Sequence, residues 1–263
     1  MLDANHDLPG LVWGYRIDPT SGQATRLSSD VTPAMLAEGP GFVWLHLNIA
    51  DARVGALLDG FEWLTEQARS VLTTHDTHAA LTVDDQMVFG TLVDFQREFD
   101  KETRDLGWLH FALCDRFIIT TRLQPIRSID RVRAAVEKNS AKYRSPMHLF
   151  ETLVAEFQRG IISVGIELTE ELNAIEDFVY DSELRDERRR LAPVRRVVVR
   201  LYRHLRTMLS LMRRAAASDD EDMPFEQWRA IEEGEMVLTG IHDVRGLLAV
   251  DHSAEDARRL GSE

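Results

Sequence analysis

The sequence predicts an α/β fold, with a layered N-terminal domain around a mixed sheet, then a long antiparallel helical hairpin and the start of another helix. Three observations lead to this fold class. The first 145 residues contain short runs rich in Val, Ile, Phe, Trp and Thr, which favour strands. From residue 146 onward, apolar residues recur every three or four positions, as in helices, and charges are separated into acidic and basic blocks. We therefore expect three segments, at 1–145, 146–218 and 219–263.

Several runs in the N-terminal segment have the composition of strands. They lie at 11–17, 42–48, 87–95, 106–114 and 116–121. Asp115 and Arg116 separate the last two runs, which predicts a β-hairpin with its turn at these residues. A further turn is expected at 105–107.

Helices are expected between these strands. They are placed at 32–38, 51–58, 65–73 and 125–139. The first three begin with Thr32, Asp51 and Thr65, whose side chains can accept a hydrogen bond from a backbone N–H of the first helical turn. Strands and helices in this order favour an α/β layer.

Two long amphipathic helices follow. In the first, which starts at Ser145-Pro146, the apolar residues Val154, Ile161, Leu168 and Ile175 are seven positions apart. The second shows the same seven-residue spacing at Val194, Leu201 and Met208 and is expected to begin near Asp186, with an early kink at Pro193. The segment 181–187 between them is short and polar, so the helices should form an antiparallel hairpin with facing apolar seams. A third helix is expected from Phe225 to Val250.

The charge distribution is uneven along the chain. The formal net charge of −13 argues against nucleic-acid binding. Residues 151–187 hold 11 acidic and 2 basic side chains, whereas residues 188–218 hold 10 arginines and no acidic residue. Residues 219–263 are again acidic, with 13 carboxylates and 4 arginines. We interpret this alternation as compensation between an acidic helix and a basic one.

Cysteine content and hydropathy indicate a cytoplasmic chain. Cys114 is the single cysteine, so no internal disulfide can form, and residues 1–9 lack the features of a secretory signal. No window approaches the roughly 18 continuous apolar residues that a spanning helix needs. We expect this chain to be soluble and not to cross a bilayer.

Motifs of nucleophilic and nucleotide chemistry do not occur in the sequence. There is no Gly-x-Ser-x-Gly, no Gly-rich loop followed by Lys and no Cys-x-x-Cys. We therefore expect neither an enzyme nor an organic cofactor. His46 and Cys114 lie in apolar strands, and we interpret them as a hydrogen-bonded sheet histidine and a buried small apolar residue.

Candidate metal ligands occur at three places. His75, Asp76 and His78 could present two imidazoles and a carboxylate to zinc if the backbone turns there, although a solvated loop is the simpler interpretation. His242-Asp243 and Asp251-His252 also pair ligand-type residues. Because adjacent side chains on a helix diverge by about 100°, one residue of each pair could coordinate only across an interface.

The order of these segments resembles the CorA-type divalent-cation transporters, closest to the zinc-transporting ZntB branch. The resemblance lies in the strand signature Gly-Phe-Val-Trp-Leu-His-Leu at 41–47 and in Leu-His-Phe-Ala-Leu-Cys-Asp-Arg-Phe-Ile-Ile-Thr-Thr-Arg at 109–122. It continues in the leucine-and-acid pattern at 172–179 and in Arg-Leu-Ala-Pro-Val-Arg at 190–195. It spans about residues 11–250.

This resemblance implies a homopentameric funnel. Its α/β domains and its acidic and basic helices lie on the cytoplasmic face of the inner membrane, and a stalk helix leads into two membrane helices joined by Gly-Met-Asn. That motif is absent here, and the stalk candidate in 219–263 ends at Glu263. The chain thus resembles the soluble domain alone, as a piece of a longer transporter that reaches the membrane only through a missing C-terminal region. The resemblance also makes Glu226 a possible ligand of a regulatory ion.

Three functions therefore remain open. The leading hypothesis is the cytoplasmic domain of a zinc or magnesium transporter that senses or funnels the ion as a homopentamer. The second is a soluble scaffold that binds a partner through Arg195, Arg196, Arg200 and Arg203 on the basic helix. The third is a zinc hydrolase at His75, Asp76 and His78, which requires a concave pocket.

Overall fold

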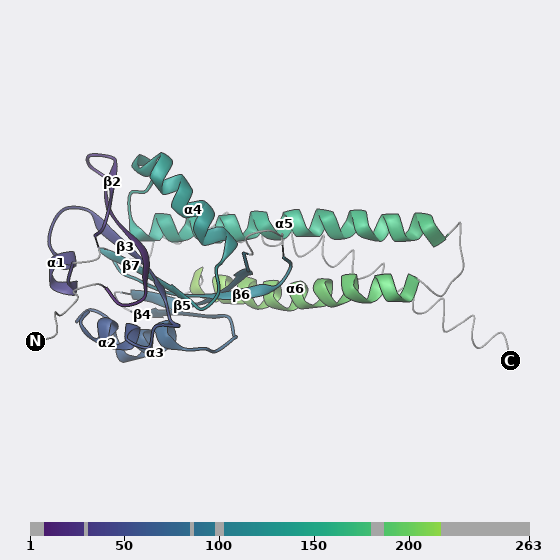
Figure 1. Ribbon diagram of the computed structural model, residues 1–263, viewed down its shortest axis with the longest axis horizontal. Coiled ribbons are helices and arrows are strands. Elements are labelled where there is room, and N and C mark those ends of the chain that lie inside the picture. The colour runs from purple at the N-terminus through teal and green to yellow at the C-terminus, as the bar shows by residue number, and fades with distance from the viewer. Residues whose placement is uncertain (1–7, 29–30, 85–86, 98–102, 180–186, 217–263) are drawn as a thin grey trace, which may run out of the picture. The chain divides into compact units, whose positions relative to one another are not determined.

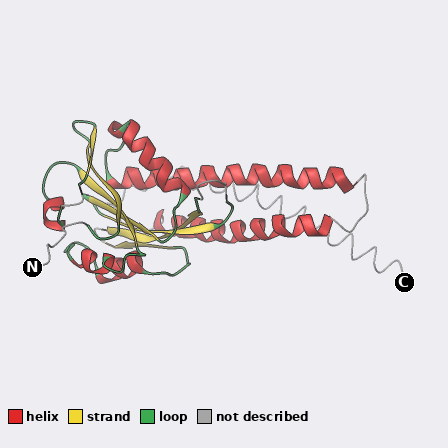
Figure 2. Ribbon diagram, in the orientation of Figure 1, coloured by secondary structure: helices red, strands yellow, loops and turns green. Residues whose placement is uncertain are grey.

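The computed structural model describes residues 8–28, 31–84, 87–97, 103–179 and 187–216. These residues belong to two compact units, Met1–Phe157 and Gln158–Glu263. The first unit contains a mixed sheet with helices on both faces, as the sequence predicts (Figure 1, Figure 2). Long helix α5 begins in the first unit and continues into the second.

The seven-stranded sheet has the strand order β2-β1-β3-β7-β6-β5-β4. Its strands are β1 Leu11–Asp18, β2 Gln23–Arg26, β3 Phe42–Asn48, β4 Ala80–Asp84, β5 Met87–Phe95, β6 Leu106–Leu113 and β7 Phe117–Arg122. Among the strands that the structure describes, only β3 and β7 pair in parallel, with Trp44 opposite Ile118 and His46 opposite Thr120. All other neighbours are antiparallel, including the predicted hairpin of β6 and β7.

Two strands were not predicted, and one predicted turn is wrong. β2 and β4 lie at the two edges of the sheet and are short, and β2 is mostly exposed. Neither therefore carries the buried apolar alternation that identifies the central strands. The turn expected at 105–107 is displaced, because Leu106 and Gly107 already pair with Phe95 and Asp94 as part of β6.

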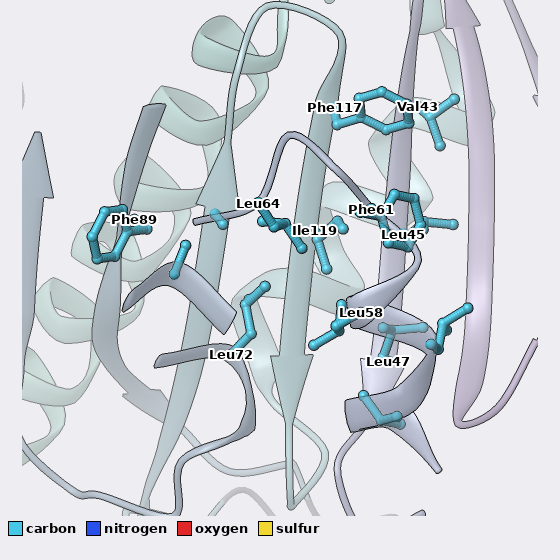
Figure 3. Packing of buried hydrophobic residues seen from close by; sticks show 14 of the residues in the cluster. Val43, Leu45, Leu47, Leu58, Phe61, Leu64, Leu72, Phe89, Phe117 and Ile119 are labelled. Carbon is cyan, nitrogen blue, oxygen red and sulfur yellow. The ribbon is translucent and has the colours of Figure 1, made fainter. Parts of the chain in front are cut away.

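One face of the sheet forms a hydrophobic core with α2 (Val54–Asp59) and α3 (Glu66–Thr73). Val43, Leu45 and Leu47 alternate along β3 toward this face, as do Phe117 and Ile119 of β7. Leu58, Phe61, Leu64 and Leu72 meet them from the helical layer, as Figure 3 shows. The period of two along the strands thus places every second side chain in this core.

The opposite face is covered by α4 (Arg127–Lys138) and the first turns of α5 (Pro146–Val179). α4 buries Ile129, Val132 and Val136, which recur every three or four positions. The ring of Phe150 from α5 lies 4.4 Å from that of Phe111 on β6, measured between centroids. The central strands are therefore buried on both faces.

Two of the predicted helix caps are present and one is wrong. Thr32, before α1 (Pro33–Ala37), accepts a hydrogen bond from Met35 N, and Thr65 accepts one from Ala68 N. Asp51 does not cap α2, which begins three residues later with no side-chain cap. Instead Asp51 accepts hydrogen bonds from Gly10 N at 3.0 Å and from Arg53, which join the residue before β1 to the residue before α2.

The long helices appear where the sequence places them. In α5, Val154, Ile161 and Leu168 are buried, and in α6 (Glu187–Ala216) Val194 and Leu201 are buried, so the apolar spacing marks the covered sides. The described part of α6 starts at Glu187 and the helix continues through Pro193, whereas the expected start near Asp186 lies outside the described residues. The third predicted helix, from Phe225 to Val250, lies outside the described residues. Within the described part of the chain, no helix is both long and apolar enough to span a membrane.

Helix α4 receives its N-terminal cap from a neighbouring strand. Its own flanking residue, Ile126, has no polar side chain, and the carboxylate of Asp94 on β5 takes this role. Asp94 accepts hydrogen bonds from Ser128 N and Ser128 Oγ, both at 2.9 Å. Its side chain is almost fully buried, and burial raises its pKa to about 6 despite these hydrogen bonds. The fold thus retains a carboxylate at a site that favours its protonated form.

We predict that Asp94 makes stability decrease as pH rises from about 4 to 6. In this interval the unfolded chain has lost the Asp94 proton and the folded chain still holds it, so ionisation favours unfolding by up to about 3 kcal/mol. Relative to wild type, the variant Asp94→Asn should gain stability across this interval. Chemical denaturation at several pH values measures this, with exposed Asp59→Asn as the control. Parallel pH profiles for Asp94→Asn and wild type would contradict it.

Candidate functional site

A buried polar network is centred on the parallel strand pair. His46 is 1% exposed, and its Nδ1 lies 3.0 Å from Thr120 Oγ1 on the neighbouring strand. Arg122 Nε donates to His46 Nε2 at 3.0 Å. A guanidinium only donates, so Nε2 is the acceptor and the imidazole carries its proton on Nδ1, which donates to Thr120. His46 is therefore the hydrogen-bonded sheet histidine that the sequence predicts.

Thr120 joins three groups in this network. Its hydroxyl accepts from His46 Nδ1 and, at 3.2 Å, from Trp44 Nε1, and it donates to the carbonyl of Leu45 at 3.1 Å. The ring of Trp13 stacks on His46 with 4.6 Å between centroids. Burial, with the charge of Arg122 as a second cause, holds the pKa of His46 well below its ordinary value. The imidazole is neutral, and its tautomer is fixed.

Charged residues of α4 border this network. Asp130 forms an ion pair with Arg97 at 2.6 Å, and Arg133 forms one with Glu137 at 3.1 Å. The hydroxyl of Tyr15 donates to Glu137, and burial together with this hydrogen bond raises the pKa of Tyr15. The Tyr15–Glu137 hydrogen bond joins α4 to β1, and the Asp130–Arg97 ion pair joins α4 to the segment after β5, so we interpret the network as structural and not as a site of chemistry.

The predicted zinc residues His75, Asp76 and His78 lie in an exposed loop between α3 and β4. His78 Nδ1 lies 2.5 Å from Asp76 Oδ1, and this hydrogen bond lowers the pKa of Asp76. Below the loop, buried His110 on β6 contacts Thr91 Oγ1 at 2.9 Å. Its pKa is lowered to about 4 by burial and, second, by the charge of His75. Sequence reasoning missed His110, because only the folded loop places it near His75.

A preformed metal site is not seen in these segments. Among the described residues, no group of three or more His, Cys, Asp or Glu is arranged so that it could hold a metal ion. Of the loop residues, Asp76 and His78 meet as a pair. The other predicted ligands, Glu226, His242, Asp243, Asp251 and His252, lie outside the described residues. Metal binding by any of these residues stays a prediction.

The arginines that the scaffold hypothesis requires are exposed on α6. Arg195, Arg196, Arg200 and Arg203 all lie at exposed positions of this helix. Glu170 is exposed on α5, and Glu167 and Glu171 are half-buried there. Partner binding through the arginines stays a prediction.

Cys114 is half-buried against the core, and burial raises the pKa of its thiol, so it fits the inert apolar role expected for it.

Comparison with known proteins connects these features to a family. The sequence profile of the CorA-like Mg2+ transporter protein family matches residues 39–247. The matched range, 39–247, runs from the residues just before β3 through both long helices. No curated protein sequence matches the chain significantly.

Solved structures share the fold at low sequence identity. The ZntB cytoplasmic domain from Vibrio parahaemolyticus matches with a TM-score of 0.78 and 16% identity, covering 95% of this chain and 98% of that chain. The full-length CmaX protein matches with a TM-score of 0.72 and 18% identity, covering 97% and 82%. The soluble domain of CorA from Methanocaldococcus jannaschii matches at 0.69 and 12%, covering 92% and 95%. The α/β fold class is thereby confirmed.

We predict that Thr120→Val destabilises the fold by about 3 kcal/mol. The substitution keeps the side-chain volume but leaves Trp44 Nε1 and His46 Nδ1 buried without an acceptor, at a cost of about 1–3 kcal/mol for each unsatisfied donor. Urea denaturation measures the loss. Thr82→Val, at an exposed position of β4, is the matched control and should change stability little. Equal stability of the two variants would show that the network contributes nothing.

Proposed function

Because its residues 39–247 match the family profile, this chain belongs to the CorA-like Mg2+ transporter protein family, and we propose that it forms the cytoplasmic part of a divalent metal cation transporter. In this proposal the domain assembles as a homopentamer and concentrates or senses the ion. The observation that carries the proposal is the length of the match, which includes the central strands and both charged helices.

The charges of the long helices support a role with cations. The segment 151–187 holds 11 acidic side chains, and 219–263 holds 13. Several copies that bring such segments together would create a negative potential, and this potential raises the local concentration of divalent cations. The basic residues of α6 balance part of this charge and reduce the repulsion that assembly would otherwise cause.

An exposed apolar patch on α5 supports self-assembly. Ile162 is 43% exposed and Ile166 is 56% exposed, and they lie one helical turn apart on the same side of the helix. Gly165 lies beside them, and a Cβ added there would meet no atom within 4 Å, so another surface can approach closely at this position. Exposed apolar side chains that cluster in this way are typical of surfaces that other proteins cover. We propose that a second copy of the chain covers this patch.

The proposed ion is zinc or magnesium. Carboxylates alone favour magnesium, whereas carboxylates with histidine favour zinc. His242 and His252 are each next to an aspartate in the sequence and are our candidates for zinc ligands, together with Glu226. The same reasoning applies to His75 and His78, with the difference that their loop offers only the Asp76–His78 pair.

We predict that the chain forms a particle of about five times its 30.0 kDa mass. Light scattering coupled to size exclusion measures this, with and without Zn2+. Ile162→Asp combined with Ile166→Asp should lower the mass, because carboxylates would be buried without partners in the contact. Arg159→Asp, at an exposed α5 position, is the charge control. A strictly monomeric protein at high concentration, even with Zn2+ present, would contradict the assembly.

We predict that Zn2+ binding depends on the C-terminal histidines. Replacing both His242 and His252 by Ala should weaken Zn2+ binding at least about tenfold, because each substitution removes a candidate metal ligand. The double variant His75→Ala/His78→Ala should leave the affinity nearly unchanged. Isothermal titration calorimetry with Zn2+ and with Mg2+ measures both. If only the His75→Ala/His78→Ala variant loses affinity, the Zn2+ site lies in the loop at residues 75–78. If neither variant loses affinity, none of these histidines is a Zn2+ ligand.

A further inference from the structure

An exposed stripe on α5 combines apolar side chains with a carboxylate. Ile162 is 43% exposed and Ile166 is 56% exposed. Glu170 is exposed at the same four-residue spacing, so the three side chains follow one side of the helix. Within the described part of the chain, Glu170 takes part in no ion pair. We call these three residues the α5 stripe.

Helix α6 carries a stripe of complementary composition. Val199 is 36% exposed, and Arg196 and Arg203 lie three residues before it and four residues after it, at exposed positions on the same side. Arg196 Nε donates to the carbonyl of Ala192 in its own helix. Neither arginine forms an ion pair with a residue that the structure describes. This α6 stripe, residues 196, 199 and 203, thus has an apolar centre between two positive charges.

The symmetry of a ring restricts what the α5 stripe can contact. In a homopentamer, the assembly of the proposed function on which this inference rests, each copy has a neighbour on either side. A surface that packs against its own equivalent joins two copies and then closes, so a ring of five needs a contact between two different surfaces. The α5 stripe of one copy must therefore pack against another surface of the next copy.

The exposed apolar residues limit the choice of this second surface. Apart from the two isoleucines, the large apolar residues exposed in the described part of the chain are Met35, Leu123 and Val199. Met35 lies on α1, a helix of 5 residues, and Leu123 lies in the loop after β7, so neither can follow α5 over several turns. Val199 lies on a helix of 30 residues. We infer that the α5 stripe of one copy packs against the α6 stripe of the next copy.

The charges of the two stripes match in either relative direction of the helices. When Ile166 lies opposite Val199, Glu170 lies opposite an arginine. This arginine is Arg203 for parallel helices and Arg196 for antiparallel ones, because both stripes have a spacing of three or four residues. The other arginine lies beside the second isoleucine and can cover it with its aliphatic stem. The contact thus has an apolar centre and a paired charge at its border, as protein interfaces usually do.

Disulfide cross-linking tests the inference on the full chain, with Cys114→Ala to remove the native thiol. Co-expressed Ile166→Cys and Val199→Cys chains should form a covalent dimer on a non-reducing gel after oxidation, because a disulfide requires Cα atoms within about 7 Å. Neither variant alone should form it, since each contact then contains one cysteine. Met35→Cys is the matched control, because Met35 is 54% exposed and Ile166 is 56% exposed. Co-expressed with Ile166→Cys, it should give no dimer.

Charge reversal is a second test that introduces no cysteine. Glu170→Arg should weaken assembly at least about tenfold, because it places like charges in the contact. Arg196→Glu combined with Arg203→Glu should weaken it for the same reason. The chain with all three substitutions should assemble as wild type does, because opposite charges face each other again. Light scattering at several protein concentrations measures these changes.

The outcomes separate this inference from the assembly itself. If Ile166→Cys chains alone form the dimer, two α5 stripes meet each other and the inference is overturned. It is also overturned if the co-expressed Ile166→Cys and Val199→Cys chains form no dimer, or if no charge reversal changes the mass, while the wild-type chain assembles. In these cases the homopentamer of the proposed function stands with a different interface. A wild-type chain that stays monomeric at high concentration would contradict both.

Discussion

The parallel pairing of β3 with β7 is the constraint on which the α/β unit depends. These strands are separated by 68 residues, from Asn48 to Phe117, and within the described part of the chain they form the only parallel pair. A parallel pair cannot be joined by a tight turn, so the intervening chain must cross over, and here it builds α2, α3 and the strands of the other half of the sheet. Both faces of the pair are then covered by helices, which is the usual condition of parallel strands.

Because these strands are buried, the polar side chains on them must find hydrogen-bond partners within the protein. His46 and Thr120 lie opposite each other in the parallel register, and each satisfies the other in a region without solvent. Arg122 extends the network toward the border of the sheet, where α4 supplies Asp130 and Arg133. Asp94 is a second case, because this buried carboxylate accepts hydrogen bonds from Ser128 and so replaces the missing cap of α4. Buried polar groups in this unit therefore fix the positions of strands and helices.

The functional proposal rests on the family match and on two features of the long helices, their charge and their exposed apolar residues. Membership of the transporter family follows from the long profile match, and the ion-related role is supported by the charge blocks and by the exposed isoleucines of α5.

The sequence by itself determined the central strands, the positions of the two long helices, and the alternation of acidic and basic segments. These features depend on residues near one another in the chain, through the period of two in strands and of 3.6 in helices. It could not identify β2, because the segment Gln-Ala-Thr-Arg is mostly exposed and becomes a strand only through its hydrogen bonds to β1. The sequence also could not show that Asp94 caps α4, and it wrongly predicted Asp51 as the cap of α2. Both outcomes depend on which element lies opposite these side chains.

The tertiary structure alone decided which residues meet. It placed Thr120 beside His46, His110 near His75, and Arg69 beside Asp59. Each of these pairs joins segments whose separation in the chain carries no local pattern. Their contacts follow from the packing of the helices on the sheet and from the register of the strands, which are properties of the whole unit and not of any one segment.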